Sequence, residues 1–178
     1  MYRKYIKRTL DFTLAFIGLI ILSPLLLILA LMIKLDSPGP ALFKQKRYGI
    51  NKTFFLIKKY RTMRTDTPKN TPTDLLENPE QYITRIGRVL RKTSMDELPQ
   101  IWQILTGKMS IIGPRPALWN QDDLIAERDK YGANDIRPGL TGWAQISGRD
   151  ELPIDVKAKF DGEYLLKMNF AFDVKCFF

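Results

Sequence analysis

The 178-residue sequence contains no histidine and a single cysteine, Cys176, and these two scarcities exclude several kinds of site. Metal sites built on His or Cys side chains are excluded, so any bound metal would be a hard cation on oxygen ligands, with Mg²⁺ the first candidate. Covalent or acid–base chemistry must fall on carboxylates, hydroxyls, lysine or water. A single cysteine forms no internal disulfide, which suits a domain that faces the cytosol.

Acidic residues are scarce relative to basic ones. The chain has 19 Asp and Glu against 28 Lys and Arg, which gives a formal net charge of +9. A surplus of this size favours anionic partners, namely lipid headgroups, nucleotide phosphates or nucleic acid. The length fits one modest domain in addition to an N-terminal segment.

Charge is absent from one long stretch, the 22 residues from Phe12 to Ile33. As a straight helix this stretch would be about 33 Å long, enough to span a bilayer. No small-residue cleavage site follows it, so a cleaved signal peptide is not expected. Both of its flanks are basic, through Arg3, Lys4, Lys7 and Arg8 before it and Lys34, Lys44, Lys46 and Arg47 after it.

The Ser23-Pro24 dipeptide at the midpoint of this stretch leaves two interpretations open. Proline removes a backbone donor and kinks a helix, and a spanning helix should carry positive charge mainly on its cytoplasmic side. A central proline between symmetric basic flanks fits a re-entrant hairpin that enters and leaves the membrane by one face. Proline kinks also occur in spanning helices, so the residues alone favour neither path.

The stretch 93–100 places two adjacent carboxylates, Asp96 and Glu97, at a predicted helix start. Ser94 followed three residues later by Glu97 fits a capping box, and apolar residues then recur at helical spacing. The alternative is that Asp96 itself is the cap, which places Pro99 where no backbone donor is needed. In either case the helix dipole favours an ionised Asp96 and a bound phosphate.

Acidic residues in a first turn usually only cap a helix. Here the lack of His and of a useful thiol leaves carboxylates as the main reactive groups. A group of basic residues also precedes the pair in the sequence: Arg85, Arg88, Arg91 and Lys92. This combination favours a chemical role for Asp96 and Glu97.

Two further stretches are candidates for phosphate binding. Residues 58–63 are a basic cluster with an aromatic residue inside it, although a solvated strand end explains such a cluster somewhat better when it is taken alone. Arg115 lies between two prolines that restrict the backbone, after a predicted short strand and a Gly-Pro turn. A guanidinium held in this way suits bidentate phosphate binding, and pairing with a carboxylate is the structural alternative.

The remaining patterns predict structure more than chemistry. Residues 41–47 predict a short strand, residues 65–78 a surface loop and residues 83–90 an amphipathic helix. Residues 122–131 predict a charged surface helix to which no function is assigned. Residues 137–149 form a turn region rich in glycine that matches neither a Walker loop nor a dinucleotide fingerprint.

Together and in order, these motifs resemble the bacterial sugar transferases, the small monotopic phosphoglycosyl transferases that act on polyprenol phosphate. The resemblance covers nearly the whole chain, and several motifs in the right order are far more specific than any one of them. They are the basic-flanked apolar segment with Ser23-Pro24, Lys59-Tyr60-Arg61-Thr62-Met63, Asp96-Glu97-Leu98-Pro99-Gln100, Gly113-Pro114-Arg115-Pro116, residues 137–145 and Gly148-Arg149.

The resemblance implies an α/β, mostly α, fold in two parts. Residues 1–36 would form a re-entrant membrane helix hairpin broken at Ser23 and Pro24. Residues 37–178 would form a small cytosolic catalytic domain with amphipathic surface helices. The implied location is monotopic, on the cytosolic face of the bacterial inner membrane.

The resemblance also implies an activity and the residues that perform it. The protein would transfer a sugar 1-phosphate from a UDP-sugar to undecaprenyl phosphate and release UMP, as the first membrane step of glycan assembly. Asp96 would be the nucleophile that carries the phosphosugar, and Glu97 would help to hold Mg²⁺. By motif match the site would be lined by Lys59, Arg91, Arg115, Arg149 and Asp161, the last in a looser match.

A non-catalytic alternative is a basic, membrane-anchored module that binds anionic lipid or nucleic acid. The charge and the apolar segment alone support it, but it gives no reason for the motif 113–116 or for carboxylates inside a basic surround. We therefore expect an enzyme whose partners are a UDP-sugar donor, undecaprenyl phosphate and membrane lipid, and not nucleic acid.

Overall fold

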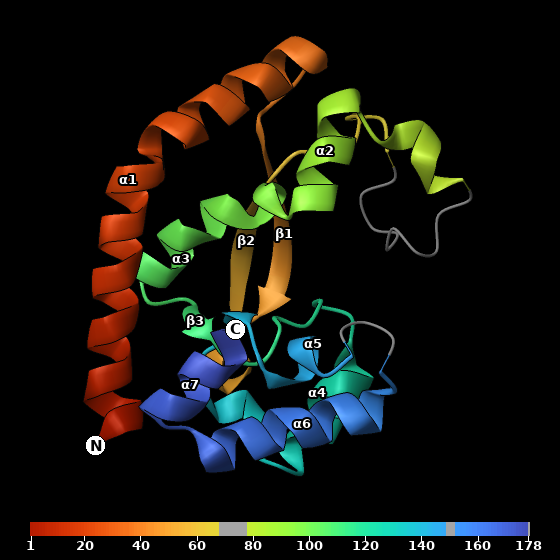
Figure 1. Cartoon of the computed structure of the whole chain (residues 1–178). Helices are drawn as coiled ribbons and strands as arrows, with labels where there is room; N and C mark the ends of the chain where they lie inside the picture. Colours follow the sequence, from red (N-terminus) through yellow and green to blue (C-terminus); the bar gives the residue numbers. More distant parts are fainter. Residues whose placement is uncertain (68–77, 149–151, 178) are drawn as a thin grey trace. The chain divides into compact units, whose positions relative to one another are not determined.

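A computed structural model describes residues 1–67, 78–148 and 152–177 (Figure 1). The expected architecture, α/β and mostly α, is confirmed, as are a strand close to 41–47 and a helix close to 83–90. In chain order the elements are η1 (Tyr2–Ile6), α1 (Lys7–Asp36), β1 (Leu42–Tyr48), η2 (Ile50–Lys52), β2 (Phe54–Tyr60), η4 (Pro79–Tyr82), α2 (Arg85–Thr93), η5 (Met95–Gln100), α3 (Ile101–Leu105), β3 (Ser110–Ile112), α4 (Asp122–Asp129), η6 (Ala133–Asp135), β4 (Gly139–Thr141), α5 (Trp143–Ile146), α6 (Ile154–Lys167) and α7 (Phe170–Phe177).

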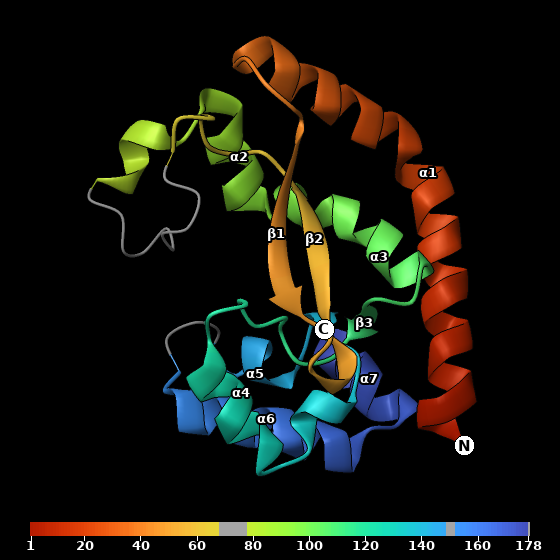
Figure 2. The same cartoon turned by 180° about the vertical axis from the view of Figure 1, so that it is seen from behind.

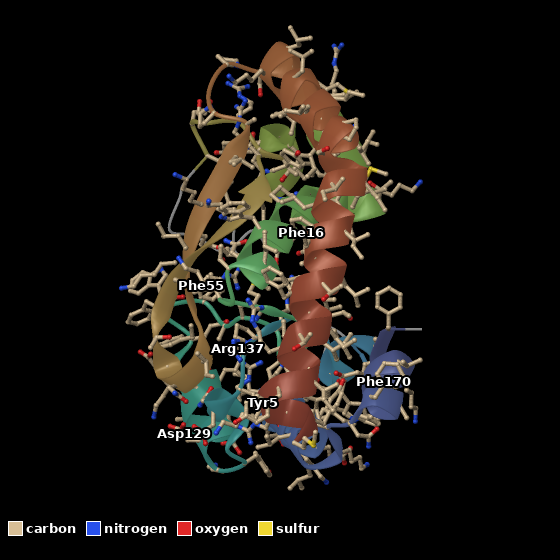
Figure 3. All side chains as sticks on the ribbon, turned by 90° about the vertical axis from the view of Figure 1, so that its left-hand side faces the viewer. Tyr5, Phe16, Phe55, Asp129, Arg137 and Phe170 are labelled. Atoms are coloured by element: carbon tan, nitrogen blue, oxygen red, sulfur yellow. The ribbon has the colours of Figure 1, made fainter. Side chains whose placement is uncertain are left out.

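The N-terminal helix α1 is long, apolar and sparsely covered by the rest of the protein. Together with the short π-helix η1, its length and composition are sufficient to cross a membrane. Only 11% of its most apolar stretch is buried, and large side chains such as Phe16 and Ile21 are exposed. Figure 3 shows the side chains that project from this helix, with Phe16 labelled. So large an exposed apolar surface is unfavourable in water, and this supports association of the helix with a membrane.

Ser23 and Pro24 lie inside α1, which continues through them from Lys7 to Asp36. Because proline has no N–H, the carbonyl of Ile20 lacks the donor that a helix usually provides four residues later. The Ser23 hydroxyl donates to this carbonyl at 2.8 Å and so satisfies it. The structure thus has a continuous helix where a break was predicted, and the re-entrant path stays a prediction.

Two compact units make up the chain, and each is described by itself. One comprises residues 1–19, 45–57 and 100–178, and the other comprises residues 20–44 and 58–99. The expected division at residue 36 separates a membrane segment from a cytosolic domain. It is a division by environment, and it also stays a prediction.

The unit of residues 20–44 and 58–99 has its core where α1, the end of β2 and α2 meet. Leu29, Ile33, Tyr60 and Leu90 are buried together there. The strands β1 and β2 are hydrogen-bonded neighbours in a two-stranded sheet, and they lie side by side in Figure 2. Met95 and Leu98 of η5 pack against the same core, which places the basic end of β2 next to the helical segment that bears the two carboxylates.

The unit of residues 1–19, 45–57 and 100–178 contains a short parallel pair of strands, of which the sequence predicted the first, before the Gly-Pro turn, but not the second or their pairing. Ser110 of β3 lies opposite Gly139 of β4, and Ile112 lies opposite Thr141. The helices α5, α6 and α7 pack around this pair, with Tyr164 among the buried residues. The helix α4 lies against α6, and the two are side by side in Figures 1 and 2.

Polar side chains fix the first turns of α1 within this same unit. The Asp11 carboxylate accepts hydrogen bonds from the Ile111 amide at 3.0 Å and from the Ser110 hydroxyl at 2.7 Å. The Arg8 guanidinium donates to two carbonyls at the end of α3, at 2.6 and 2.8 Å. Since Asp11 is buried, these bonds satisfy a charge that would otherwise be costly to remove from water.

Candidate active site

The two carboxylates Asp96 and Glu97 lie in the first turn of the 3₁₀ helix η5, which leads directly into α3. The prediction that Asp96 stands at a helix start is confirmed. The predicted capping box stays a prediction, since Ser94 is the C-cap of α2 and directly precedes η5. Its φ of 56° is left-handed, and its amide donates to the Arg91 carbonyl at 3.2 Å. The helix α2 therefore ends, and η5 begins, within two residues.

Lys59 at the end of β2 forms an ion pair with Glu97. Its ammonium nitrogen lies 2.5 Å from Glu97 Oε1, and the two side chains are 18% and 19% exposed. Since both charges are largely removed from water, each needs the other, and loss of one would leave an uncompensated charge. The basic cluster 58–63 is therefore not simply a solvated strand end. One of its lysines is committed to the carboxylate pair.

Arg91, near the end of α2, is held by Thr62. Its Nε donates to Thr62 Oγ1 at 2.9 Å, and the Thr62 carbonyl accepts from the Thr84 amide at 3.0 Å. A Cβ atom added at Gly87 would lie 2.0 Å from the Thr62 carbonyl oxygen, so the approach of α2 to this strand end requires glycine there. Thr62 thus sets where the Arg91 guanidinium lies.

The half-buried Asp96 carboxyl interacts electrostatically with Lys59, Arg91 and Glu97. Burial is the largest influence and raises its pKa above the ordinary 3.8. The Lys59 ammonium and the Arg91 guanidinium lower the pKa, while the adjacent Glu97 carboxylate raises it. A carboxylate that is poorly hydrated and yet surrounded by cations can approach an anionic phosphorus centre, so the cluster is suited to phosphoryl chemistry.

The other predicted site residues belong to the unit of residues 1–19, 45–57 and 100–178 or lie outside the described residues. Arg115 is partly exposed and lies between β3 and α4. Asp161 of α6 is 1% exposed and forms an ion pair with Arg128 of α4 at 2.7 Å. Arg149 lies outside the described residues. The structure thus brings Lys59, Arg91, Asp96 and Glu97 into one cluster, and it describes Arg115 and Asp161 in the other unit.

Sequence reasoning assigned no individual role to Thr62 or to Arg128. Thr62 gave no clear signal beyond its place in the basic cluster. Arg128 did give one, because Leu124, Ile125 and Arg128 recur at i, i+1 and i+4 and therefore share a helix face. All three are buried, so the helix predicted as a charged surface element has one arginine on its inner face.

The donor set of this cluster fits Mg²⁺. This ion is usually bound through one or two carboxylates together with the phosphates of a substrate. Within residues 1–67, 78–148 and 152–177, no group of three or more Asp, Glu, Cys and His residues is arranged to hold a metal ion. A metal at Asp96 and Glu97 would therefore share its coordination with a bound phosphate ligand.

Several curated proteins are similar to this chain over most of its length. The chain is 37% identical over 188 residues to the UDP-glucose:undecaprenyl-phosphate glucose-1-phosphate transferase of Escherichia coli K12, covering 98% of this chain and 39% of that protein. It is 46% identical over 146 residues to the enzyme of the same name from Caulobacter vibrioides, covering 80% of this chain and 54% of that protein. It is 38% identical over 176 residues to the exopolysaccharide production protein PSS of Rhizobium leguminosarum, covering 93% and 87%.

The chain thus spans only part of the length of two of these curated relatives, 39% of the Escherichia coli protein and 54% of the Caulobacter protein. The profile of the bacterial sugar transferase family, in contrast, matches residues 2–178, which is almost the entire sequence. That match includes the apolar helix, the carboxylate pair and the Gly-Pro-Arg-Pro turn. The protein belongs to the bacterial sugar transferase family.

Proposed function

We propose that this protein transfers a sugar 1-phosphate from a UDP-sugar to undecaprenyl phosphate, giving polyprenyl diphosphosugar and UMP. The observation that carries the proposal is the half-buried pair of Asp96 and Glu97 with the cations Lys59 and Arg91 beside it. Relatives named as UDP-glucose:undecaprenyl-phosphate glucose-1-phosphate transferases support the donor and acceptor classes. The reaction would be the first membrane step in assembly of a bacterial glycan.

The transfer proceeds in two displacements at phosphorus. A carboxylate oxygen of Asp96 attacks the phosphorus next to the sugar, and the bond from that phosphorus to the oxygen of UMP breaks. UMP leaves with the electron pair, and the phosphosugar is held as an acyl phosphate on Asp96. A phosphate oxygen of undecaprenyl phosphate then attacks the same phosphorus, the bond to Asp96 breaks and the carboxylate is regenerated.

The neighbouring charges make the first displacement possible. A diphosphate donor repels a carboxylate nucleophile, and the guanidinium of Arg91 and the ammonium of Lys59 offset that repulsion. Lys59 also holds Glu97, so it fixes one carboxylate while its charge acts on the other. Arg115 and Arg149 are proposed to bind the donor phosphates, for which a guanidinium fork is well suited.

Glu97 is the residue we propose as a ligand for Mg²⁺, with Asp96 as the second nearby carboxylate. A bound Mg²⁺ ion would neutralise part of the charge of the diphosphate and of the departing UMP. Glu97 would thereby leave Asp96 as the carboxylate that is available to the phosphorus. The ion pair with Lys59 holds Glu97 at this place.

The apolar helix α1 keeps the reaction where the lipid acceptor lies. We propose that it enters and leaves the membrane by the cytosolic face, because basic residues flank it on both sides and Pro24 interrupts its backbone donors. The Ser23 hydroxyl lowers the cost of that proline in lipid, since it satisfies the Ile20 carbonyl.

A screen of UDP-sugars tests the proposal. The purified protein, Mg²⁺ and undecaprenyl phosphate are incubated with each UDP-sugar, and UMP is measured. We expect at least one UDP-sugar to release UMP in an amount that follows the acceptor supplied. If every UDP-sugar stays intact while the protein still binds anionic vesicles, the protein is a membrane-binding module and the proposal is wrong.

A further inference from the structure

The Gly-Pro-Arg-Pro turn that carries Arg115 is held by donors from outside the turn. Pro114 and Pro116 have no backbone N–H, so the turn has few donors of its own. Four successive carbonyls instead accept hydrogen bonds from other parts of the same unit. They are Pro114 from the Gly139 amide at 2.8 Å, Arg115 from Arg128 Nη2 at 3.0 Å, Pro116 from Arg47 Nη1 at 2.9 Å and Ala117 from the Tyr48 amide at 2.9 Å.

The donor to the Arg115 carbonyl differs from the others because it belongs to a buried ion pair. Arg128 is 4% exposed and Asp161 is 1% exposed. Arg128 Nε donates to Asp161 Oδ2 at 2.7 Å, and Nη2 lies 2.7 Å from the same oxygen. A planar guanidinium can bind a carboxylate and a carbonyl at once, which a lysine ammonium cannot do in the same fixed geometry. Asp161 therefore fixes the plane of Arg128, and Arg128 fixes the peptide of Arg115.

The backbone next to Asp161 is shaped to allow this pairing. A Cβ atom added at Gly162 would lie 2.5 Å from Cβ of Tyr131, just beyond α4. Only a residue without Cβ lets α6 approach the end of α4 so closely. Asp161 thus reaches Arg128 because its neighbour on α6 is glycine.

Asp161 has little surface to offer a substrate. Burial raises the pKa of its carboxyl, and the Arg128 guanidinium opposes that rise. An ion pair this deeply buried contributes little to net stability compared with apolar residues of similar volume, so its retention needs another reason. The bond to the Arg115 carbonyl provides one.

We propose that Arg128 and Asp161 are a positioning pair, which sets the backbone of Arg115 and thereby the place where its guanidinium meets the donor phosphates. The proposal rests on the role given to Arg115 above. Neither member of the pair touches the substrate. Asp161 acts on Arg128, Arg128 acts on the Arg115 carbonyl, and only Arg115 acts on the donor.

Steady-state kinetics of UMP release test this chain of contacts. In Arg128→Lys the charge toward Asp161 is kept and the fork is lost, so we expect KM for the UDP-sugar to rise about tenfold or more, since small misplacements of a binding group are costly. A merely structural defect would instead reduce the fraction of active enzyme and lower kcat at unchanged KM. The exposed neighbour on α4 supplies the control. Asp129→Asn removes the surface ion pair with Lys52, keeps an amide oxygen that can accept from Asn134 Nδ2, and should keep both constants.

The decisive comparison is a double-mutant cycle with Arg115→Lys. If Arg128 acts through Arg115, the KM of the double variant should lie within about twofold of the higher of the two single-variant KM values. A rise in KM equal to the product of the two single-variant rises would overturn the proposal. If Arg128→Lys does not fold, Asp161→Asn takes its place in the same cycle with the same two outcomes. Absence of UMP release by the wild-type protein would contradict the proposed function itself, which separates the two failures.

Discussion

Asp96 is the residue at which burial and charge oppose each other most directly. Burial raises its pKa, while Lys59 and Arg91 lower it. The charged form of this carboxyl therefore gains less from hydration than that of an exposed one. This is the condition in which a weak nucleophile becomes useful, because less solvation must be lost before it reacts.

Replacing Asp96 by Asn should separate function from stability. The pKa of Asp96 is higher in the folded state than in the unfolded state. The free energy of unfolding therefore falls as pH rises between these two pKa values, and this loss of stability persists at pH 7. Asp96→Asn removes that cost together with the nucleophile. We expect turnover to fall on the order of 10⁴-fold or more while Tm at pH 7 is no lower than that of the wild-type protein. A lower Tm with partial activity would contradict this account.

The charge of Lys59 should be visible in the pH dependence of the reaction. Its ammonium lowers the pKa of Asp96, so Lys59→Gln should raise that pKa further. The acidic limb of the profile of kcat/KM against pH should then move to higher pH. Arg88→Gln, which removes an exposed cation of α2 paired to Glu80, is the matched control and should leave the limb in place.

At the scale of elements, the segment 59–62 joins the apolar helix α1 to the carboxylate pair. Tyr60 donates from its hydroxyl to the Leu26 carbonyl at 2.6 Å. Arg61 donates to the carbonyls of Ser37, Pro38 and Pro40 at 2.7 to 2.8 Å, just beyond the end of α1. The flanking Lys59 and Thr62 hold Glu97 and Arg91. The two inner residues of this short segment therefore hold the helix and its end, and the two outer residues hold the site.

The close approach of α2 to this segment gives an element-scale prediction. Gly87→Ala would place Cβ 2.0 Å from the Thr62 carbonyl, so α2 must shift. We expect a loss of about 1–3 kcal/mol in stability and a rise in KM for the UDP-sugar, because Arg91 moves with α2. In Gly18→Ala of α1 the added Cβ meets nothing within 4 Å, so activity should be unchanged. Thermal unfolding in detergent and UMP release measure both effects.

Local patterns predicted most elements, and contacts distant in sequence account for what they missed. The strand near 41–47 and the helix near 83–90 were predicted because turn residues and apolar spacing are local signals. The parallel pairing of β3 with β4 was not, because nothing in either three-residue strand specifies its partner. Ser94 shows the limit of a local capping pattern, since a serine that precedes an acidic turn can also end the previous helix.

The same limit applies to the candidate site. The adjacent carboxylates and the basic cluster were found from composition and motif order, and the structure brings Lys59 and Arg91 to them. The roles of Thr62 and Arg128 depend on side-chain contacts between separate elements. The spacing of residues in the sequence does not predict such contacts, although the helical spacing could have placed Arg128 on the buried face of α4.

For the whole molecule, the question is how α1 meets the membrane. A hairpin that enters and leaves by the cytosolic face places both of its ends on one side. Single cysteines at Lys4, Ser37 and the exposed Lys92, in a background lacking the buried Cys176, should all be labelled from the cytosolic side in intact cells. Labelling of Lys4→Cys and Ser37→Cys from opposite sides would show a spanning helix instead.

The central claim is that Asp96 carries the phosphosugar between donor and acceptor. Mass spectrometry of the wild-type protein after incubation with its UDP-sugar and Mg²⁺, without undecaprenyl phosphate, tests this most directly. We expect at most about one UMP per active site, a phosphosugar adduct on the peptide that contains Asp96, and loss of that adduct when undecaprenyl phosphate is added. Asp96→Asn should form none. Product that appears only when donor and acceptor are bound together, with no adduct at any stage, would mean direct displacement and would contradict this account.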